Sequence, residues 1–131
     1  MFEKWFGKRA APLTGAPTVR RLKSYSGASG YVYQYAFEGM RPLGGGTEYV
    51  FAVSADRKTW AEVTVRVAGD VVRGWEREHG RELSTTEWYA LAKMSLFAAF
   101  DERENPAALR GEPVVVRAAD VAGILETLGL E

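Results

Sequence analysis

The chain of 131 residues contains no cysteine, a single histidine and no long apolar run. The lack of cysteine excludes disulfides, thiolate metal ligands and a cysteine nucleophile. A membrane-spanning helix needs about 18 consecutive apolar residues, and no run of that length occurs, so the sequence predicts no transmembrane segment. The first nine residues lack the apolar stretch of a secretory signal. We therefore expect a cytoplasmic protein.

Charge is balanced overall but unevenly spread along the chain. The formal net charge is zero. Residues 1–23 hold six basic side chains and one acid, a balance of +5, and the remainder of the chain carries −5. Such asymmetry is typical of a basic arm that contacts an anionic partner. The alternative is an arm that lies against its own acidic domain.

The composition predicts one globular domain behind a short leader. Hydrophobic residues make up 47% and charged residues 26% of the chain, which is ordinary for a domain with its own core. Residues 1–17 have the composition of an irregular basic and aromatic leader, and we assign residues 18–131 to a single α+β domain. Aromatic and lysine residues alternate in residues 1–9, a pattern that favours weak membrane contact. The alternative is that these rings pack on the domain or on a second copy.

The stretch 84–104 carries the strongest helical signal. Ser84 to Glu87 form a capping box, in which each of these two side chains accepts from the backbone amide of the other. Proline at position 106 predicts the end of the helix, because it lacks an N–H and clashes with the preceding turn. Between these signals the helix is apolar on nearly every side. We predict a long central helix that is covered on more than one side.

Alternating residues upstream predict an antiparallel sheet. Four strands are expected, at 18–25, 31–38, 47–54 and 59–67, with a glycine-rich loop at 39–46 and a hairpin turn at 55–58. Their odd-numbered residues give one apolar face, on which the helix would pack, and the other face is mostly polar. Residues 114–116 are apolar and predict a fifth strand.

Two shorter helices complete the predicted fold. Asp70 is the expected N-cap of a helix at 71–79 that ends at Gly80, and residues 118–128 form a second helix that ends at Gly129. Strands come first and helices afterwards, which favours the α+β class over a parallel α/β sheet. We predict a four- to five-stranded antiparallel sheet with one face packed against the long helix and two shorter helices.

His79 is the only candidate for histidine chemistry. Glu76 and His79 are three residues apart, so they share a helix face as in carboxylate-bridged metal sites. Such sites need a second histidine, which the chain lacks. A histidine at the end of a helix is also explained by the negative end of the helix dipole. The sequence therefore indicates no metal site and no cofactor.

Glycine-rich and acidic segments have simple structural interpretations. Neither Ser26–Gly30 nor Gly44–Gly46 matches a phosphate-binding motif or leads into a helix, so we interpret both as flexible connections between strands. Asp101, Glu102 and Glu104 follow the long helix without the spacing of a calcium loop. Acids at this end oppose the helix dipole, and the sequence gives no reason for their placement.

The polar face of the predicted sheet is the best candidate binding surface. It carries Trp60 beside Gln34, Glu62 and Arg66. An exposed tryptophan among hydrogen-bonding residues is typical of protein interfaces. Acids balance the cations there, which argues against nucleic acid, because single strands bind where cations flank the stacking ring. The alternative is that Trp60 covers a sheet edge or packs beneath the leader.

These patterns favour a small non-enzymatic protein-interaction module that acts through the polar sheet face or the basic leader. Its partner would be another protein or a second copy of the chain. One alternative is a small-ligand-binding protein or enzyme with a cleft near His79 and the glycine-rich loops. Another is a peripheral membrane or nucleic-acid contact through residues 1–23. The sequence assigns no catalytic residue.

Overall fold

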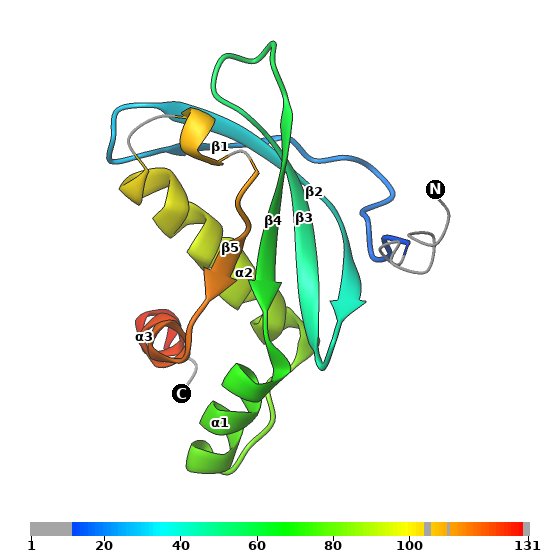
Figure 1. The fold of residues 1–131 in the computed structure, drawn as a ribbon, viewed down its shortest axis with the longest axis vertical. Coiled ribbons are helices and arrows are strands. Elements are labelled where there is room, and N and C mark those ends of the chain that lie inside the picture. The colour runs from blue at the N-terminus through cyan, green and yellow to red at the C-terminus, as the bar shows by residue number, and fades with distance from the viewer. Residues whose placement is uncertain (1–11, 104–105, 110, 130–131) are drawn as a thin grey trace, which may run out of the picture.

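A computed structural model describes residues 12–103, 106–109 and 111–129. It confirms the α+β class, with a curled sheet and three α-helices (Figure 1). The elements follow in the order β1 (Lys23–Ser26), β2 (Val32–Leu43), β3 (Gly46–Ser54), β4 (Ala61–Val67), α1 (Gly69–His79), α2 (Thr85–Glu102), the 3₁₀ turn η2 (Pro106–Leu109), β5 (Val114–Val116) and α3 (Ala118–Leu128).

The sheet has the strand order β1-β2-β3-β4-β5, so neighbours in the sequence are neighbours in space. The first four strands form the predicted antiparallel meander. The fifth strand exists, but it runs parallel to β4, with Val114 opposite Val65. The reason is that α1 and α2 carry the chain back to the start of β4 before β5 begins, as a parallel pair requires.

The prediction of a loop at 39–46 is wrong, because most of these residues belong to strands β2 and β3. β2 continues to Leu43 and β3 begins at Gly46, which leaves a two-residue turn in which Gly44 has a φ of 58°. A positive φ at this position is what tight hairpin turns require. A β-bulge between Phe37 and Gly39 interrupts the alternation, and this break hid the second half of β2 from a period-two reading.

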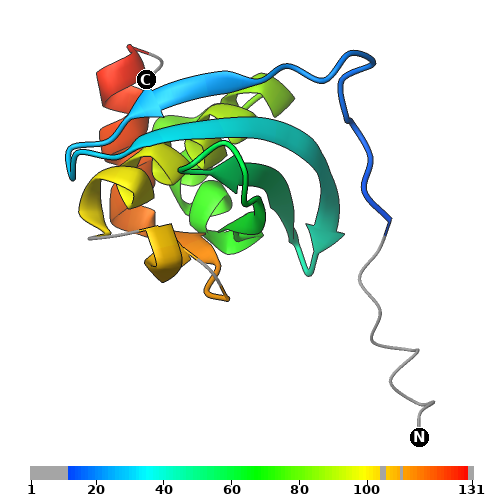
Figure 2. The same cartoon turned by 90° about the horizontal axis from the view of Figure 1, so that it is seen from above.

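The apolar face of the sheet forms the core, as predicted. Tyr33, Phe51 and Val65 are fully buried there. Figure 2 shows the sheet curving around the helices. Aromatic rings of α2 stack on rings of the first two strands: Phe100 lies 4.2 Å from Tyr33 and Phe97 lies 4.3 Å from Tyr25, measured between ring centroids. These contacts join the end of α2 to the start of the sheet.

Helix α2 has the predicted start. Ser84 Oγ accepts from the Glu87 amide at 3.1 Å, and Glu87 Oε1 accepts from the Ser84 amide at 2.8 Å. The helix is unbroken but ends at Glu102. The predicted arrangement of one long central helix and two shorter helices on one sheet face is matched only in part. Helix α1 lies beyond the end of the sheet, at the bottom of Figure 1, and packs on α3.

The two shorter helices end as predicted but one begins differently. Gly80 and Gly129 follow them with positive φ angles of 66° and 72°. The N-cap of α1 is Ala68, and Asp70 lies within the first turn. Gly69 is the first residue of α1 and has no room for a side chain, because a Cβ there would collide with the Gly45 carbonyl.

The acids at the end of α2 are explained in part by a contact that is distant in sequence. Asp101 accepts hydrogen bonds from the Tyr25 hydroxyl at 2.8 Å and from the Ala28 amide at 2.9 Å. The Ser26–Gly30 connection therefore rests on the end of α2. This carboxylate holds the β1–β2 turn in place.

The leader predicted at residues 1–17 lies largely outside the described residues, which begin at position 12. Its last part is tied to the sheet, since Thr14 exchanges two backbone hydrogen bonds of 2.8 Å with Met40. The predicted edge strand at 18–25 is shorter than expected and begins at Lys23. Among the described helices, none combines the length and the apolar character that crossing a membrane requires.

Candidate functional site: a groove beside β5

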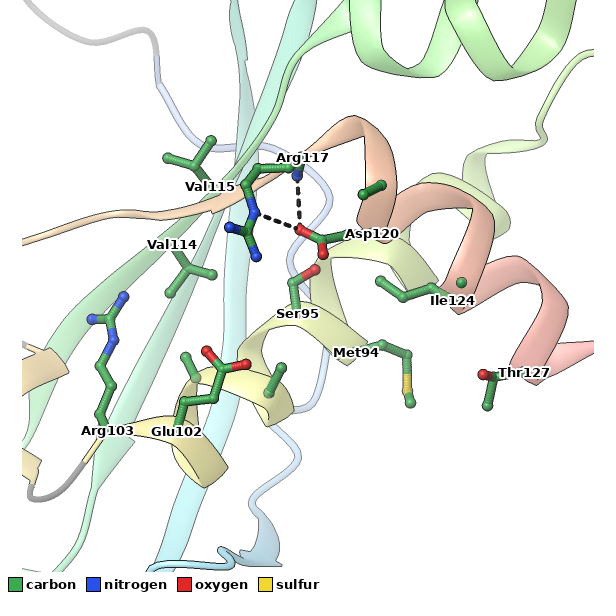
Figure 3. A pocket seen from close by; sticks show the side chains of 14 residues that line it. Met94, Ser95, Glu102, Arg103, Val114, Val115, Arg117, Asp120, Ile124 and Thr127 are labelled. Carbon is green, nitrogen blue, oxygen red and sulfur yellow. Dashed lines mark hydrogen bonds and ion pairs between the residues drawn. The ribbon is translucent and has the colours of Figure 1, made fainter. Parts of the chain in front are cut away.

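A groove with a volume of about 600 Å³ lies between α2, α3 and β5 (Figure 3). We call it the β5 groove. One wall is the second half of α2, the other is α3, and β5 forms its inner end. Because β5 is the last strand of the sheet, it pairs with β4 on one side only. The groove therefore lies at an open sheet edge.

The groove exists because the two helices face each other with small side chains. Ala98 and Ala99 of α2 lie opposite Ala119 and Gly123 of α3. A Cβ built on Gly123 would meet nothing within 4 Å. Helices that meet through large residues fill the space between them, whereas here the space stays open. Backbone of a bound segment can approach closely where side chains are this small.

Charged groups of both signs lie along the groove. Arg117 Nε lies 3.2 Å from Asp120 Oδ2, and the same oxygen accepts from the Arg117 amide at 2.9 Å, which caps α3 (Figure 3). Arg103 donates to the Ala108 carbonyl at 2.9 Å. Glu102 also lines the groove and forms no ion pair with any described residue. The result is a polar rim around an apolar floor.

Ser95 is the one nearly buried polar side chain in the groove wall. It is 7% exposed, and its hydroxyl points toward the Arg117–Asp120 pair in Figure 3. This hydroxyl forms no hydrogen bond within the part of the chain that the structure describes. Solvent reaches the Ser95 oxygen, because the Tyr33 hydroxyl is the one fully enclosed side-chain polar atom in the described residues that lacks a partner. Ser95 is therefore available as a donor or acceptor for whatever enters the groove.

The structure places the four predicted sheet-face residues on one face but not in one site. Gln34 lies opposite Ser54 and Arg66 lies opposite Glu48. These two rows are six residues apart along β3, or about 20 Å at the usual rise per residue. The four side chains therefore follow the length of the sheet and do not converge.

Three of these four residues already contact other side chains. Gln34 Nε2 donates to Ser24 Oγ at 2.7 Å, and Arg20 lies over the ring of Trp60 with Cζ 5.5 Å from the ring centroid. Trp60 itself is 40% exposed and Glu62 is exposed. Arg20 follows the predicted leader of residues 1–17, so this contact does not test whether Trp60 packs beneath that leader.

Arg66 belongs to an ion-pair cluster around the buried Glu48. Glu48 receives Arg66 Nε at 2.9 Å and Arg41 Nη1 at 2.7 Å, and its own side chain is 7% exposed. Burial alone raises the pKa of Glu48, but hydrogen bonds and charge from Arg66 and Arg41 outweigh it, so the pKa lies below its ordinary value. The carboxylate stays ionised and holds three adjacent strands together.

His79 lies at the far end of α1. Its ring stacks on Trp75 with centroids 4.1 Å apart, and its Nδ1 lies 2.9 Å from the Trp75 carbonyl oxygen. Of the two glycine-rich segments, Ser26–Gly30 rests on the end of α2 and Gly44–Gly46 packs on the start of α1. These contacts separate the three features. Within the described ranges, no group of three or more potential metal ligands occurs.

Sequence reasoning missed the residues of the β5 groove. The helical pattern predicts only a buried helix for Ser95, Ala98 and Ala99, and it places Glu102 only among the acids at the end of that helix. The small residues of this half of α2 are visible in the sequence, although its first half also contains alanines. That signal has no meaning until α3 is placed opposite. No family model, no curated protein and no solved structure matches this chain.

Proposed function

We propose that this protein is a non-enzymatic interaction module that binds an extended segment of another protein in the β5 groove. The segment would add to the free edge of β5 as a further strand. The observation that carries this proposal is a groove of about 600 Å³ that opens onto the last strand of the sheet. Adding a strand to an exposed sheet edge is a common mode of peptide recognition.

The dimensions of the groove support this mode. A new strand lies about 4.8 Å from its neighbour, so its backbone must pass close to α2 and α3. The small residues Ala98, Ala99 and Gly123 leave that path open. Val115, at the middle of β5, is 55% exposed and offers an apolar contact. Only three residues of β5 are available for pairing, which favours a weak and reversible complex.

The polar groups of the groove supply specificity. The Ser95 hydroxyl can bond a backbone amide or carbonyl of the segment, and Glu102 can receive a cation from it. Arg117 and Asp120 already neutralise each other. They would therefore shape the rim of the groove without requiring a charged residue in the bound segment. A segment with a basic side chain near its apolar residues would fit best.

The proposal keeps the predicted function but moves its location. The polar sheet face and the leader were the predicted binding surfaces. The sheet-face residues largely bond to one another or to the segment before β1, whereas Ser95 and Glu102 do not. Unpaired groups that face a cavity favour binding more than paired groups on a flat sheet. The cytoplasmic location stays a prediction of the sequence.

Selection from a library of extended peptides tests the proposal. Peptides of about ten residues would be displayed and selected on the full chain, and binding of the enriched peptides measured by fluorescence anisotropy. Gly123→Leu fills the groove, and we expect it to weaken binding at least about tenfold. Gly74→Leu is the matched control, because Gly74 is also helical with open space at its Cβ but lies on α1.

Both substitutions replace a helical glycine and raise helix propensity equally, so a difference in binding reports the groove itself. Shifts of the Val115 and Ser95 amide resonances on adding peptide would place the contact. Equal binding by the two variants, or no peptide enriched over a scrambled library, would refute the proposal.

A further inference from the structure

The first part of the leader has the composition that the β5 groove favours. Residues 1–11 lie outside the described ranges. In sequence they contain three large aromatic residues and three basic ones against a single acid: Phe2, Trp5, Phe6, Lys4, Lys8 and Arg9. A segment in which basic side chains stand near apolar ones is what the groove is expected to bind. The chain therefore carries a candidate occupant of its own groove type.

The surroundings of the groove have the opposite charge. Residues 94–103 and 117–128, which form its two walls and their ends, hold four acids against Arg103 and Arg117, a balance of −2. Residues 1–11 have a balance of +2. Glu102 lines the groove and lies nearest to an entering cation. Opposite net charges attract the segment toward the groove and raise its rate of association.

The open volume of the groove suits large rings. About 600 Å³ lies between walls that include Ala98, Ala99 and Gly123. A short segment gains most from residues that bury much surface at once, and an aromatic side chain buries about 150–250 Å². Trp5 and Phe6 are adjacent in the sequence, so in an extended strand one ring faces the groove and the other lies across the edge of β5.

The described chain begins at the sheet edge opposite β5, as Figure 1 shows. Thr14 bonds to Met40 of β2. Met40 lies opposite Tyr49, which lies opposite Val65, which lies opposite Val114 of β5. Thr14 therefore stands at one end of the row of residues whose other end is β5. A strand added beyond β5 is five strand spacings from Thr14, or about 24 Å.

This distance sets which copy of the chain can supply the occupant. Trp5 precedes Thr14 by nine residues, and nine residues drawn out fully span at most about 32 Å. The crossing would follow the convex outer face of the curled sheet (Figure 2), because the core and α2 fill the inner face. A leader docked on its own domain would be stretched straight, with no residue left to turn into the groove. A second copy has no such limit.

We propose that Trp5 and Phe6 of a second copy occupy the β5 groove when no other partner is bound. The inference rests on the proposed function, since it uses the same groove and the same added strand. Two copies exchange leaders reciprocally about a two-fold axis, which closes the assembly at a dimer. A segment of another protein must displace the exchanged leader, so self-association regulates access to the groove.

Sedimentation equilibrium of the full chain from about 1 to about 500 µM tests the exchange. We expect a reversible dimer. Trp5→Ser removes a ring from the leader and leaves the groove intact, whereas Gly123→Leu fills the groove and leaves the leader intact. Each should weaken dimerisation at least about tenfold. Gly74→Leu, on α1 and with open space at its Cβ, is the matched control and should keep the dimer.

A mixture of the two defective variants gives the sharpest result. The Gly123→Leu chain supplies a leader and the Trp5→Ser chain supplies a groove, so one of the two contacts forms again. We expect a 1:1 complex that is at least about fivefold tighter than either variant's own dimer, measured by fluorescence anisotropy with one variant labelled. Thermal unfolding confirms that both variants fold.

A charge reversal tests the contact without changing the shape of the groove. Glu102→Lys places a cation where the basic leader enters, and we expect it to weaken the dimer at least about threefold. Glu78→Lys makes the same change on an exposed glutamate of α1 and should leave the dimer intact. Equal effects of these two variants would contradict the placement of the leader in the groove.

The proposal is overturned if the full chain stays monomeric at about 500 µM, if Gly123→Leu and Gly74→Leu dimerise alike, or if the mixture forms no 1:1 complex. It is also overturned if Trp5→Ser shifts the Ser95 and Val115 amide resonances of the dilute monomer, which would show docking within one chain. The proposed function fails separately, because library peptides can be selected on the Trp5→Ser chain, whose groove is free in either case.

Discussion

Glu87 offers the sharpest test of how the fold is stabilised. Its carboxylate caps α2 through the Ser84 amide and also binds Arg81 through both oxygens, at 3.1 and 2.9 Å. The hydrogen bonds from Arg81 have the largest effect on the pKa of Glu87, and the hydrogen bond from the Ser84 amide has the next largest. Together they lower this pKa to about 2. Glu87→Gln keeps an oxygen for the cap and removes the charge.

The magnitude follows from that pKa. A fall from 4.5 to about 2 corresponds to a ceiling of about 3 kcal/mol, at about 1.4 kcal/mol for each tenfold change. The Glu87 side chain is 14% exposed and that of Arg81 is 38% exposed, so solvent screening reduces the value. We expect Glu87→Gln to lower the free energy of unfolding by about 1–1.5 kcal/mol at pH 7, and Glu87→Ala by about 2, because the cap is lost too.

The pH dependence gives the prediction its sign. The pKa is lower in the folded state, so the contribution is complete above the ordinary value of 4.5 and declines as the pH falls toward 2. Urea unfolding, followed by tryptophan fluorescence, should show the deficit of Glu87→Gln shrinking by more than half between pH 7 and about pH 3. Glu78→Gln, an exposed glutamate on α1, is the control. A deficit independent of pH would refute the reasoning.

Two further predictions concern the sheet and its contact with α1. Glu48→Gln should lower the free energy of unfolding by about 3 kcal/mol, because it leaves the mostly buried guanidinium of Arg41 beside a neutral group. Urea unfolding of Glu48→Gln and of the control Glu62→Gln checks this prediction. Equal losses of unfolding free energy in the two variants would contradict it. Gly69→Ala should lower the Tm by about 5 °C or more, because its Cβ would collide with the Gly45 carbonyl. Gly74→Ala, with open space at its Cβ, should raise or preserve the Tm in the same calorimetric scan.

The sequence predicted the elements whose signals are local. The capping box from Ser84 to Glu87, the glycines after α1 and α3, and the alternation along the first four strands each depend on neighbouring residues. Alternation also assigned the apolar face correctly, since Tyr33, Phe51 and Val65 are all buried on it. These features follow from backbone geometry and from the pattern of solvent exposure. A few neighbouring residues are enough to determine both.

The tertiary structure alone decided the features that depend on distant residues. The bulge after Phe37 extends β2 beyond its alternating part, and the helical crossover sets the direction of β5. Asp101 accepts a hydrogen bond from Tyr25 across more than seventy positions of the sequence. No local pattern records such encounters, because they arise when the sheet curls around α2. The β5 groove is a product of that packing, so this candidate site became visible only in the folded chain.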